Sequence, residues 1–271
     1  MNLTFLGTAA AEGFPGIFCN CSNCNAARAR GGRSLRFRSA LLVNSDLLID
    51  CGPDLLASAQ RFNLNLSQVT TNIVTHAHPD HFHIENFLLR RKPFTGGLEI
   101  PTLDLFGPRD VTDTLERSRP DLSILRMKAH PVSAFQTWSH SGYTFSTFKA
   151  NHAIGEYEAI FYSVGDEQHS FLYVTDTGLL PEETWRALAG KSFDSIILEE
   201  TLGTGTYAQH LGFDTFRETA ARMRAGGLLR PGGRLIAHHI SHSGNPVHEE
   251  LEALFAPDGV EVAYDGMEVI L

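Results

Sequence analysis

The chain has 271 residues, of which 42% are hydrophobic and 20% are charged. This composition excludes a disordered or fibrous protein and is sufficient for a substantial buried core. With 22 basic and 31 acidic residues the net charge is −9, which disfavours nucleic-acid binding because phosphodiester polymers are repelled. No apolar stretch is long enough to span a membrane and the start of the chain lacks a basic signal-peptide region, so we expect a cytoplasmic protein without membrane contacts.

Short apolar runs bounded by Gly, Pro, Asn and Asp predict strands, and the periodic segments between them predict helices. Strands are expected at residues 2–7, 40–50, 72–75, 102–106, 143–150, 158–164, 170–175, 195–199, 233–238 and 260–271. Helices are expected at residues 53–62, 83–91, 109–117, 181–190, 213–227 and 247–255. A turn at Asp46 favours an antiparallel hairpin within the second strand segment. The whole pattern predicts a layered α/β fold formed by a single domain, residues 1–271.

Three of the four cysteines are clustered near the N-terminus, at Cys19, Cys21 and Cys24. They are too close together for an ordinary disulfide framework. Soft thiolates at this spacing suit a single tetrahedral zinc ion, whose fourth ligand must come from elsewhere in the chain. Cys51 follows an apolar run instead, so we expect it to be a small buried hydrophobic residue.

The segment after residue 75 leads from a predicted strand into a polar turn that contains four candidate metal ligands. His76 and His78 are two residues apart, and in extended chain their imidazoles point to the same side. Pro79 predicts a turn into a helix that begins near Asp80, which directs Asp80 and His81 toward a second ion. One segment can therefore supply ligands to two metal ions.

Three more polar residues occur where a predicted apolar strand ends: His152, Asp176 and His239. Side chains at the same end of several strands can converge although they are distant in sequence. A carboxylate such as Asp176 has two oxygens and can bridge two cations. The neighbouring His238 is a weaker candidate than His239, because adjacent strand residues face opposite sides.

The run His76-Ala77-His78-Pro79-Asp80-His81, followed by His152, Asp176 and His239, resembles the dinuclear zinc site of the metallo-β-lactamase superfamily. The resemblance implies a metallo-β-lactamase-like αββα four-layer sandwich. It also implies two catalytic Zn²⁺ ions, or Mn²⁺ or iron in their place, held by His76, His78, Asp80, His81, His152, Asp176 and His239.

Within that superfamily, residues 6–24, 239–242 and 264–268 resemble the phosphoribosyl cyclic phosphate phosphodiesterase of carbon-phosphorus lyase pathways. The resemblance implies a structural Zn²⁺ held by Cys19, Cys21, Cys24 and His242. It also places His210 at the position of a substrate-site histidine. A leaving alkoxide needs a proton, which His210 could supply. The sequence thus predicts a phosphodiesterase for a small cyclic phosphodiester, with Asp80 and His210 as catalytic residues.

Two alternatives stay open. The same fold can hydrolyse a lactone, thioester or other ester. Residues 12–15 and the cysteine segment also resemble the B protein of pyrroloquinoline-quinone biosynthesis, an accessory or carrier that usually lacks the complete His-x-His-x-Asp-His set. The substrate, the metal in the cell and whether the protein forms a homodimer are not fixed by the sequence.

Two nearby features can be interpreted as functional or as purely structural. The arginines at positions 28, 30, 33, 36 and 38 could bind phosphate, although a solvated face is favoured over that role. Phe82 and His83 either reshape the mouth of the pocket or form the first turn of a helix.

Overall fold

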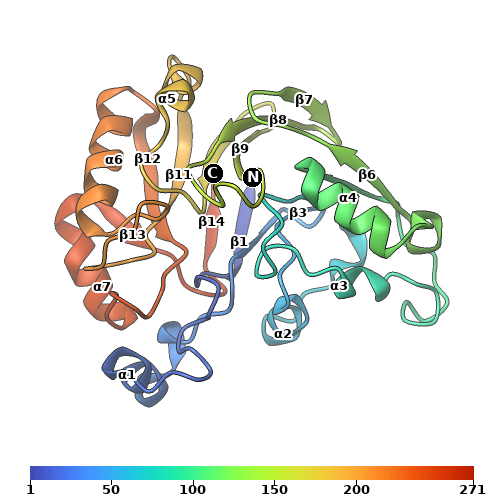
Figure 1. The fold of residues 1–271 in the computed structure, drawn as a ribbon, viewed down its shortest axis with the longest axis horizontal. Coiled ribbons are helices and arrows are strands. Elements are labelled where there is room, and N and C mark those ends of the chain that lie inside the picture. Colours follow the sequence, from blue (N-terminus) through green and yellow to red (C-terminus); the bar gives the residue numbers. More distant parts are fainter.

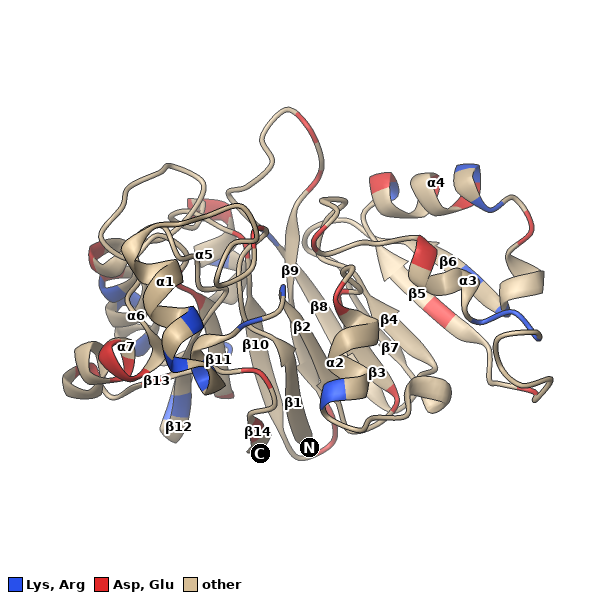
Figure 2. Ribbon diagram, turned by 90° about the horizontal axis from the view of Figure 1, so that it is seen from below, with Lys and Arg blue, Asp and Glu red and all other residues tan.

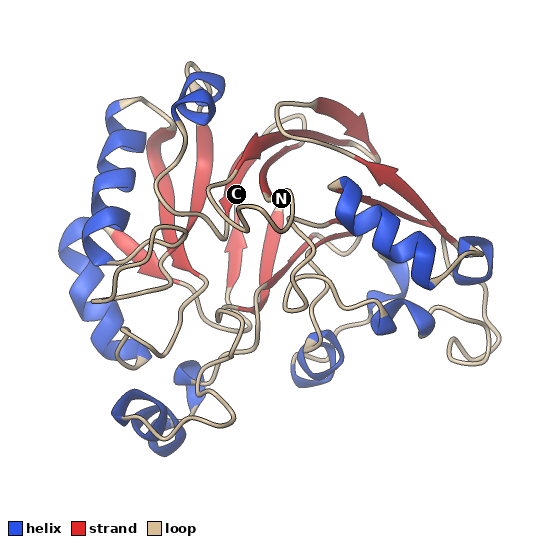
Figure 3. Ribbon diagram, in the orientation of Figure 1, coloured by secondary structure: helices blue, strands red, loops and turns tan.

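The computed structural model describes residues 1–271 and arranges them as two seven-stranded mixed sheets with helices outside both (Figures 1 and 3). In sheet order, the first sheet contains β14 (Glu268–Ile270), β1 (Asn2–Gly7), β2 (Ala40–Val43), β3 (Leu47–Ile49), β4 (Thr71–Ile73), β5 (Leu103–Gly107) and β6 (Met127–Pro131). The second contains β13 (Val260–Val262), β12 (Leu229–His238), β11 (Phe193–Glu199), β10 (Ser170–Val174), β9 (Ile160–Gly165), β8 (Tyr143–Lys149) and β7 (Thr137–His140).

Six of the seven α-helices lie in two groups, one on each side of the sheets, and α1 lies apart from both (Figure 1). The α-helices are α1 (Ser22–Arg30), α2 (Leu55–Arg61), α3 (Glu85–Leu88), α4 (Arg109–Ser118), α5 (Glu182–Leu188), α6 (Phe213–Ala225) and α7 (His248–Phe255). Helices α2, α3 and α4 lie on the side of the first sheet, and α5, α6 and α7 on the side of the second (Figure 1). None of them is long and apolar enough to cross a membrane.

Alternating strand residues build three apolar layers. In β11, Ile197 belongs to the layer between the sheets, whereas Ile196 and Leu198 belong to the layer beneath α5–α7. In β2, Leu41 faces the inter-sheet layer and Leu42 faces the helices of the first sheet. Because successive strand side chains point to opposite faces, strands covered on both sides must be apolar on both. This arrangement confirms the predicted αββα sandwich.

Most predicted elements are present, with boundaries shifted by a few residues. The antiparallel hairpin around Asp46 is confirmed by the pairing of β2 with β3, and Cys51 is buried as expected. The prediction of one strand over 260–271 is wrong. The chain turns at Gly266, whose φ is +86°, so β13 joins the second sheet and β14 joins the first.

The prediction of a helix near Asp80 is also wrong. Residues 79–81 form a turn, which is closed by hydrogen bonds from the backbone N–H groups of His81 and Phe82 to the carbonyl of His78. Helix α3 begins only at Glu85. Strands β6 and β7 and helix α1 were not predicted, because their apolar residues are few.

Candidate metal centre

The segments that follow β4, β8, β10 and β12 converge, and bring the seven predicted ligands of the dinuclear site together. The first group consists of His76, His78 and His152. Nδ1 of His78 lies 2.9 Å from Nε2 of His76 and 3.1 Å from Nε2 of His152. Three imidazole nitrogens therefore face a common point.

The second group consists of Asp80, His81, Asp176 and His239, all buried. Nε2 of His81 lies 3.0 Å from Oδ2 of Asp80 and 2.6 Å from Oδ2 of Asp176. Nε2 of His239 lies 2.9 Å from the other oxygen, Oδ1, of Asp176. Oδ2 of Asp176 is also 3.5 Å from Nε2 of His76 in the first group, so its carboxylate lies between the two groups.

Hydrogen bonds to the opposite ring nitrogens turn these imidazoles toward the centre. Oδ2 of Asp50 lies 2.7 Å from Nδ1 of His81, and Oγ1 of Thr201 lies 2.9 Å from Nδ1 of His239. Oγ1 of Thr75 lies 3.1 Å from Nδ1 of His76. Such partners fix the ring orientation of metal-binding histidines and increase their basicity.

The backbone is strained where three of these side chains leave their strands. Asp50, Asp176 and His239 have φ values of +60°, +48° and +60°. Residues other than glycine rarely adopt this left-handed conformation, and such residues concentrate at functional sites. In this conformation each side chain departs from the alternating orientation of strand residues and points into the cluster.

The two ionised carboxylates of the cluster, Asp80 and Asp176, carry the negative charge that a bound cation would complement. Burial would raise the pKa of Asp176, but the neighbouring rings of His239 and His81 hold it well below its ordinary value. Burial would lower the pKa of His81, but Asp176, Asp80 and Asp50 raise it well above its ordinary value. Burial lowers the pKa of His76, which favours the neutral imidazole that binds metals.

The donor set also fits a metal because several of its buried polar atoms converge without forming hydrogen bonds. Nε2 of His81, Oδ1 of Asp176 and Nε2 of His239 are buried and lie close to one another, but none of them makes a hydrogen bond of acceptable geometry in the protein. Buried polar atoms are nearly always satisfied, and an ion is one recognised explanation for exceptions. Imidazole and carboxylate donors are a combination that binds zinc. These residues would hold two metal ions, with Asp176 placed to contact both.

The predicted cysteine site is brought together as well. Nδ1 of His242 lies 3.7 Å from Sγ of Cys19 and 3.6 Å from Sγ of Cys21, and Cys24 completes the group. The backbone N–H of Cys24 lowers the pKa of Cys21 to about 6, and the thiolate is the form that binds metals. Three sulfurs and one nitrogen are the donors of a closed structural zinc site, which is usually tetrahedral.

His210 lies beside the dinuclear cluster. Its Nδ1 is 3.2 Å from Oε1 of the fully buried Glu199 and 3.8 Å from Oδ1 of Asp176. Its ring lies 4.8 Å from the ring of His152. Burial would lower the pKa of His210, but Glu199 raises it to about 9. This neighbour therefore favours a protonated imidazole with Nε2 uncommitted.

Sequence reasoning missed the supporting residues Asp50, Glu199 and Thr201. The first two share the signal that pointed to Asp176, a carboxylate where an apolar strand ends. The preference for a solvated arginine face is wrong at Arg36, which is buried and donates to Oγ1 of Thr8.

Neither interpretation of Phe82 holds. Its ring is buried, in the apolar layer between the first sheet and its helices, and its backbone pairs with Cys51. It therefore lines neither the mouth of the metal centre nor a helix turn.

Residues 46–240 match the family model described as "Beta-lactamase superfamily domain". The match covers more than half of the chain, which therefore belongs to the metallo-β-lactamase superfamily. With its fold and its clustered metal donors, the chain is a metal-binding, hydrolase-like member of that superfamily.

Similar proteins extend over the whole chain at low identity. Coenzyme PQQ synthesis protein B of Cupriavidus necator is 25% identical over 316 residues, covering 100% of this chain and 99% of that protein. A diphosphatase from the PhnP family has a structure with TM-score 0.77 and 24% identity, covering 99% of this chain and 96% of that one. The structure of Zn²⁺-bound PqqB from Methylobacterium extorquens has TM-score 0.75 and 19% identity, with both chains covered completely.

Proposed function

We propose that the protein is a dinuclear zinc phosphodiesterase that hydrolyses a small cyclic phosphodiester. The observation that carries the proposal is the complete set of seven converging donors, with the carboxylate of Asp176 between the two groups. Two divalent cations bound there would activate water for attack and offset the negative charge of a phosphodiester. At the site itself, the two cations would then offset the repulsion of an anionic substrate that the overall charge of −9 implies.

The chain's own residues would position these ions and supply a proton. Asp50 and Thr201 hold the rings of His81 and His239 in place. His210 is outside the seven-residue set, and Glu199 holds its Nδ1. This leaves Nε2 to donate a proton to the leaving alkoxide, the role of a general acid.

The proposal is tested by hydrolysis assays on protein loaded with increasing zinc. Turnover of a ribosyl cyclic phosphodiester should rise with bound metal and exceed turnover of a lactone or thioester. Faster hydrolysis of a carboxylic ester than of any phosphodiester would overturn the substrate class.

The role of His210 is tested separately with two leaving groups. His210→Ala should retain both metal ions and slow hydrolysis of an alkyl phosphodiester by about 10²–10⁴-fold, the usual contribution of a general acid. Hydrolysis of a nitrophenyl ester should slow much less, because its leaving group departs without a proton. His169→Ala, in a distant turn with Asp166, is the matched control. Equal losses on both substrates would show that His210 positions the substrate instead.

A second candidate is an accessory or carrier function like that of coenzyme PQQ synthesis protein B. The full-length similarity to proteins of that name favours it. Such a protein would bind metal without turnover of any phosphodiester or ester. Catalysis that scales with bound metal would exclude it.

A further inference from the structure

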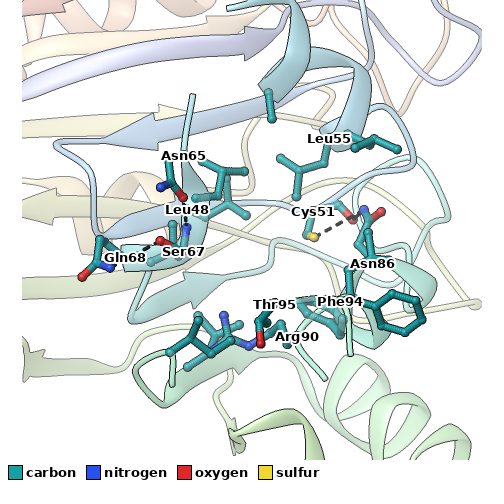
Figure 4. Close-up of a pocket in the computed structure, with 18 of the residues that line it drawn as sticks. Leu48, Cys51, Leu55, Asn65, Ser67, Gln68, Asn86, Arg90, Phe94 and Thr95 are labelled. Atoms are coloured by element: carbon teal, nitrogen blue, oxygen red, sulfur yellow. Dashed lines mark hydrogen bonds between the residues drawn. The ribbon is translucent and has the colours of Figure 1, made fainter. Parts of the chain in front are cut away.

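A cavity of about 540 Å³ lies on the outer face of the first sheet, beside α2 and α3 (Figure 4). Leu48 of β3, Leu103 of β5 and Cys51 contribute to its apolar wall. None of the candidate metal ligands lines it. Its volume falls within the range of about 300–1,000 Å³ that is typical of small-molecule sites.

Large apolar side chains around this cavity are uncovered. Leu56, Leu89, Phe94 and Leu98 all line it, and they are 55%, 46%, 61% and 72% exposed. Single exposed apolar residues are ordinary on protein surfaces, but a group of them around a hollow is typical of a binding site. The cavity is therefore suited to an apolar ligand.

A second cavity of about 330 Å³ adjoins the first and is basic. The two share four lining residues, Arg90, Thr95, Leu98 and Ile100. Besides Arg90, the second is lined by Arg91, Lys92 and Arg126, and no acidic residue lines it. The basic run after α3 is visible as a blue segment in Figure 2.

One acidic neighbour offsets part of this charge. Glu99 lines the apolar cavity, lies 3.1 Å from Nζ of Lys92 and pairs with Arg126. Four basic groups against one carboxylate still leave an excess of positive charge, in a chain whose net charge is −9. An anionic group is therefore the complementary partner for this end.

Arg90 stands where the two cavities meet and is held in a fixed position. Its Nε donates to the carbonyl of Leu125 at 3.2 Å and its Nη2 donates to the carbonyl of Pro101 at 2.6 Å. Nη1 makes no hydrogen bond within the protein, so its two N–H groups are available to a ligand. A guanidinium held in this way is well suited to bind a carboxylate.

We propose that the two cavities form one binding site for a fatty-acyl carboxylate, whose chain fills the apolar cavity and whose carboxylate lies against Arg90. The chain end would contact Leu48 and Leu103, and the exposed side chains of Phe94 and Leu98 would cover the middle of the ligand. The site is separate from the metal centre and does not depend on the proposed function.

The test is calorimetric titration of the metal-loaded protein with decanoate, decanol and acetate. Decanoate should bind saturably, one per chain, and at least tenfold more tightly than decanol, while acetate should not bind. Equal affinity for decanoate and decanol would overturn the role of the basic cavity. Because carboxylates also bind metal ions, the titration is repeated with a chelator, and decanoate binding that disappears with the metal would overturn the proposed location.

Two matched substitutions locate the site. Leu98→Glu places a carboxylate at the wall that both cavities share and should weaken decanoate binding at least tenfold. Leu254→Glu changes another exposed leucine, on α7, and should leave binding unchanged. Unchanged affinity in Leu98→Glu would overturn the proposal. A dimer seen by light scattering that dissociates in Leu98→Glu would also overturn the proposal, because a second copy of the chain would then cover the cavity.

Discussion

Two adjacent histidines at the end of β12 face opposite sides of the chain. Nε2 of His238 lies 3.0 Å from the hydroxyl of Tyr173, and its ring packs 5.4 Å from that of Phe5 between the sheets. Nε2 of His239 faces Asp176. The left-handed backbone at His239 therefore divides the pair into one core residue and one candidate ligand.

The first prediction follows from this division. His239→Ala should reduce the metal content of the dinuclear site, whereas His238→Ala should retain it. His238→Ala should instead lower the free energy of unfolding by about 1–3 kcal/mol, because the buried hydroxyl of Tyr173 loses its partner. Elemental analysis and thermal unfolding of both variants check this. Equal metal loss in the two variants would mean that the ligand assignment at β12 is wrong.

Asp50 is the next residue whose role can be measured. Its Oδ2 contacts Nδ1 of His81 while Oδ1 accepts hydrogen bonds from the backbone and hydroxyl of Thr75. Asp50→Asn keeps the size of the side chain but removes its charge, and should weaken metal binding by about 10–100-fold, as losses of such supporting groups do. Zinc titration against a competing chelator measures the change.

Asp54→Asn is the control for this titration, because Asp54 contacts Arg38 and not a candidate ligand. If Asp50→Asn bound zinc as tightly as the Asp54 control, Asp50 would have no supporting role.

The supporting residues show where sequence reasoning reaches its limit. Asp50, Asp176 and Glu199 all occur where an apolar strand ends, so the pattern alone could have nominated each as a ligand. Only the backbone conformation and the neighbours decide that Asp50 and Glu199 face histidine Nδ1 atoms. Those neighbours are distant in sequence, and a single sequence does not show which residues meet.

At the level of elements, the long apolar strands could be predicted, but two of the edge strands, β6 and β7, could not. Strand β11 is apolar on both faces because it lies between the sheet interior and α5–α7. Strands β6 and β7 are each at the edge of a sheet and only partly buried. Their pairing depends on the neighbouring strands β5 and β8, since strand preference is largely a matter of context.

Helix α1 depends on the cysteine site more than on its own composition. It has only two buried residues, Cys24 and Ala27, too few for an apolar face that could hold a helix of this length. Cys21 caps it, with Sγ accepting a hydrogen bond from the backbone N–H of Cys24 at 3.4 Å. Metal binding at this site is therefore expected to stabilise the helix.

Cys21→Ser separates the two roles of this residue, because serine is a good helix cap but lacks the thiolate. We expect the variant to lose one zinc per chain and to unfold at a lower temperature, with the other two ions and the turnover of folded protein largely retained. Elemental analysis, thermal unfolding and an activity assay measure these effects. Loss of turnover with unchanged unfolding would contradict a structural site.

Cys51→Ser is the control, since Cys51 is buried apart from the other three cysteines. This variant should retain all three metal ions, whatever its stability.

For the whole molecule, the candidate metal centre joins the two halves of the sandwich. Four candidate ligands follow β4 of the first sheet, at residues 76–81, and three follow strands of the second sheet. The superfamily resemblance was enough to predict this architecture, because a long ligand motif is tied to one fold. It was not enough to predict the substrate, which depends on the side chains around the site.

Ions shared between the sheets should make the stability of the whole fold depend on metal. A ligand present at 100 times its Kd stabilises the native state by about 2.7 kcal/mol, and each kcal/mol corresponds to roughly 2–4 °C in a domain of this size. Removing both ions of this site with a chelator should therefore lower the unfolding midpoint by about 10–20 °C, and returning zinc should restore it. Asp176→Ala, which removes the residue between both groups, should lose most of this response. Complete removal of the metals without any change in the wild-type midpoint would show that the ions do not hold the sheets together.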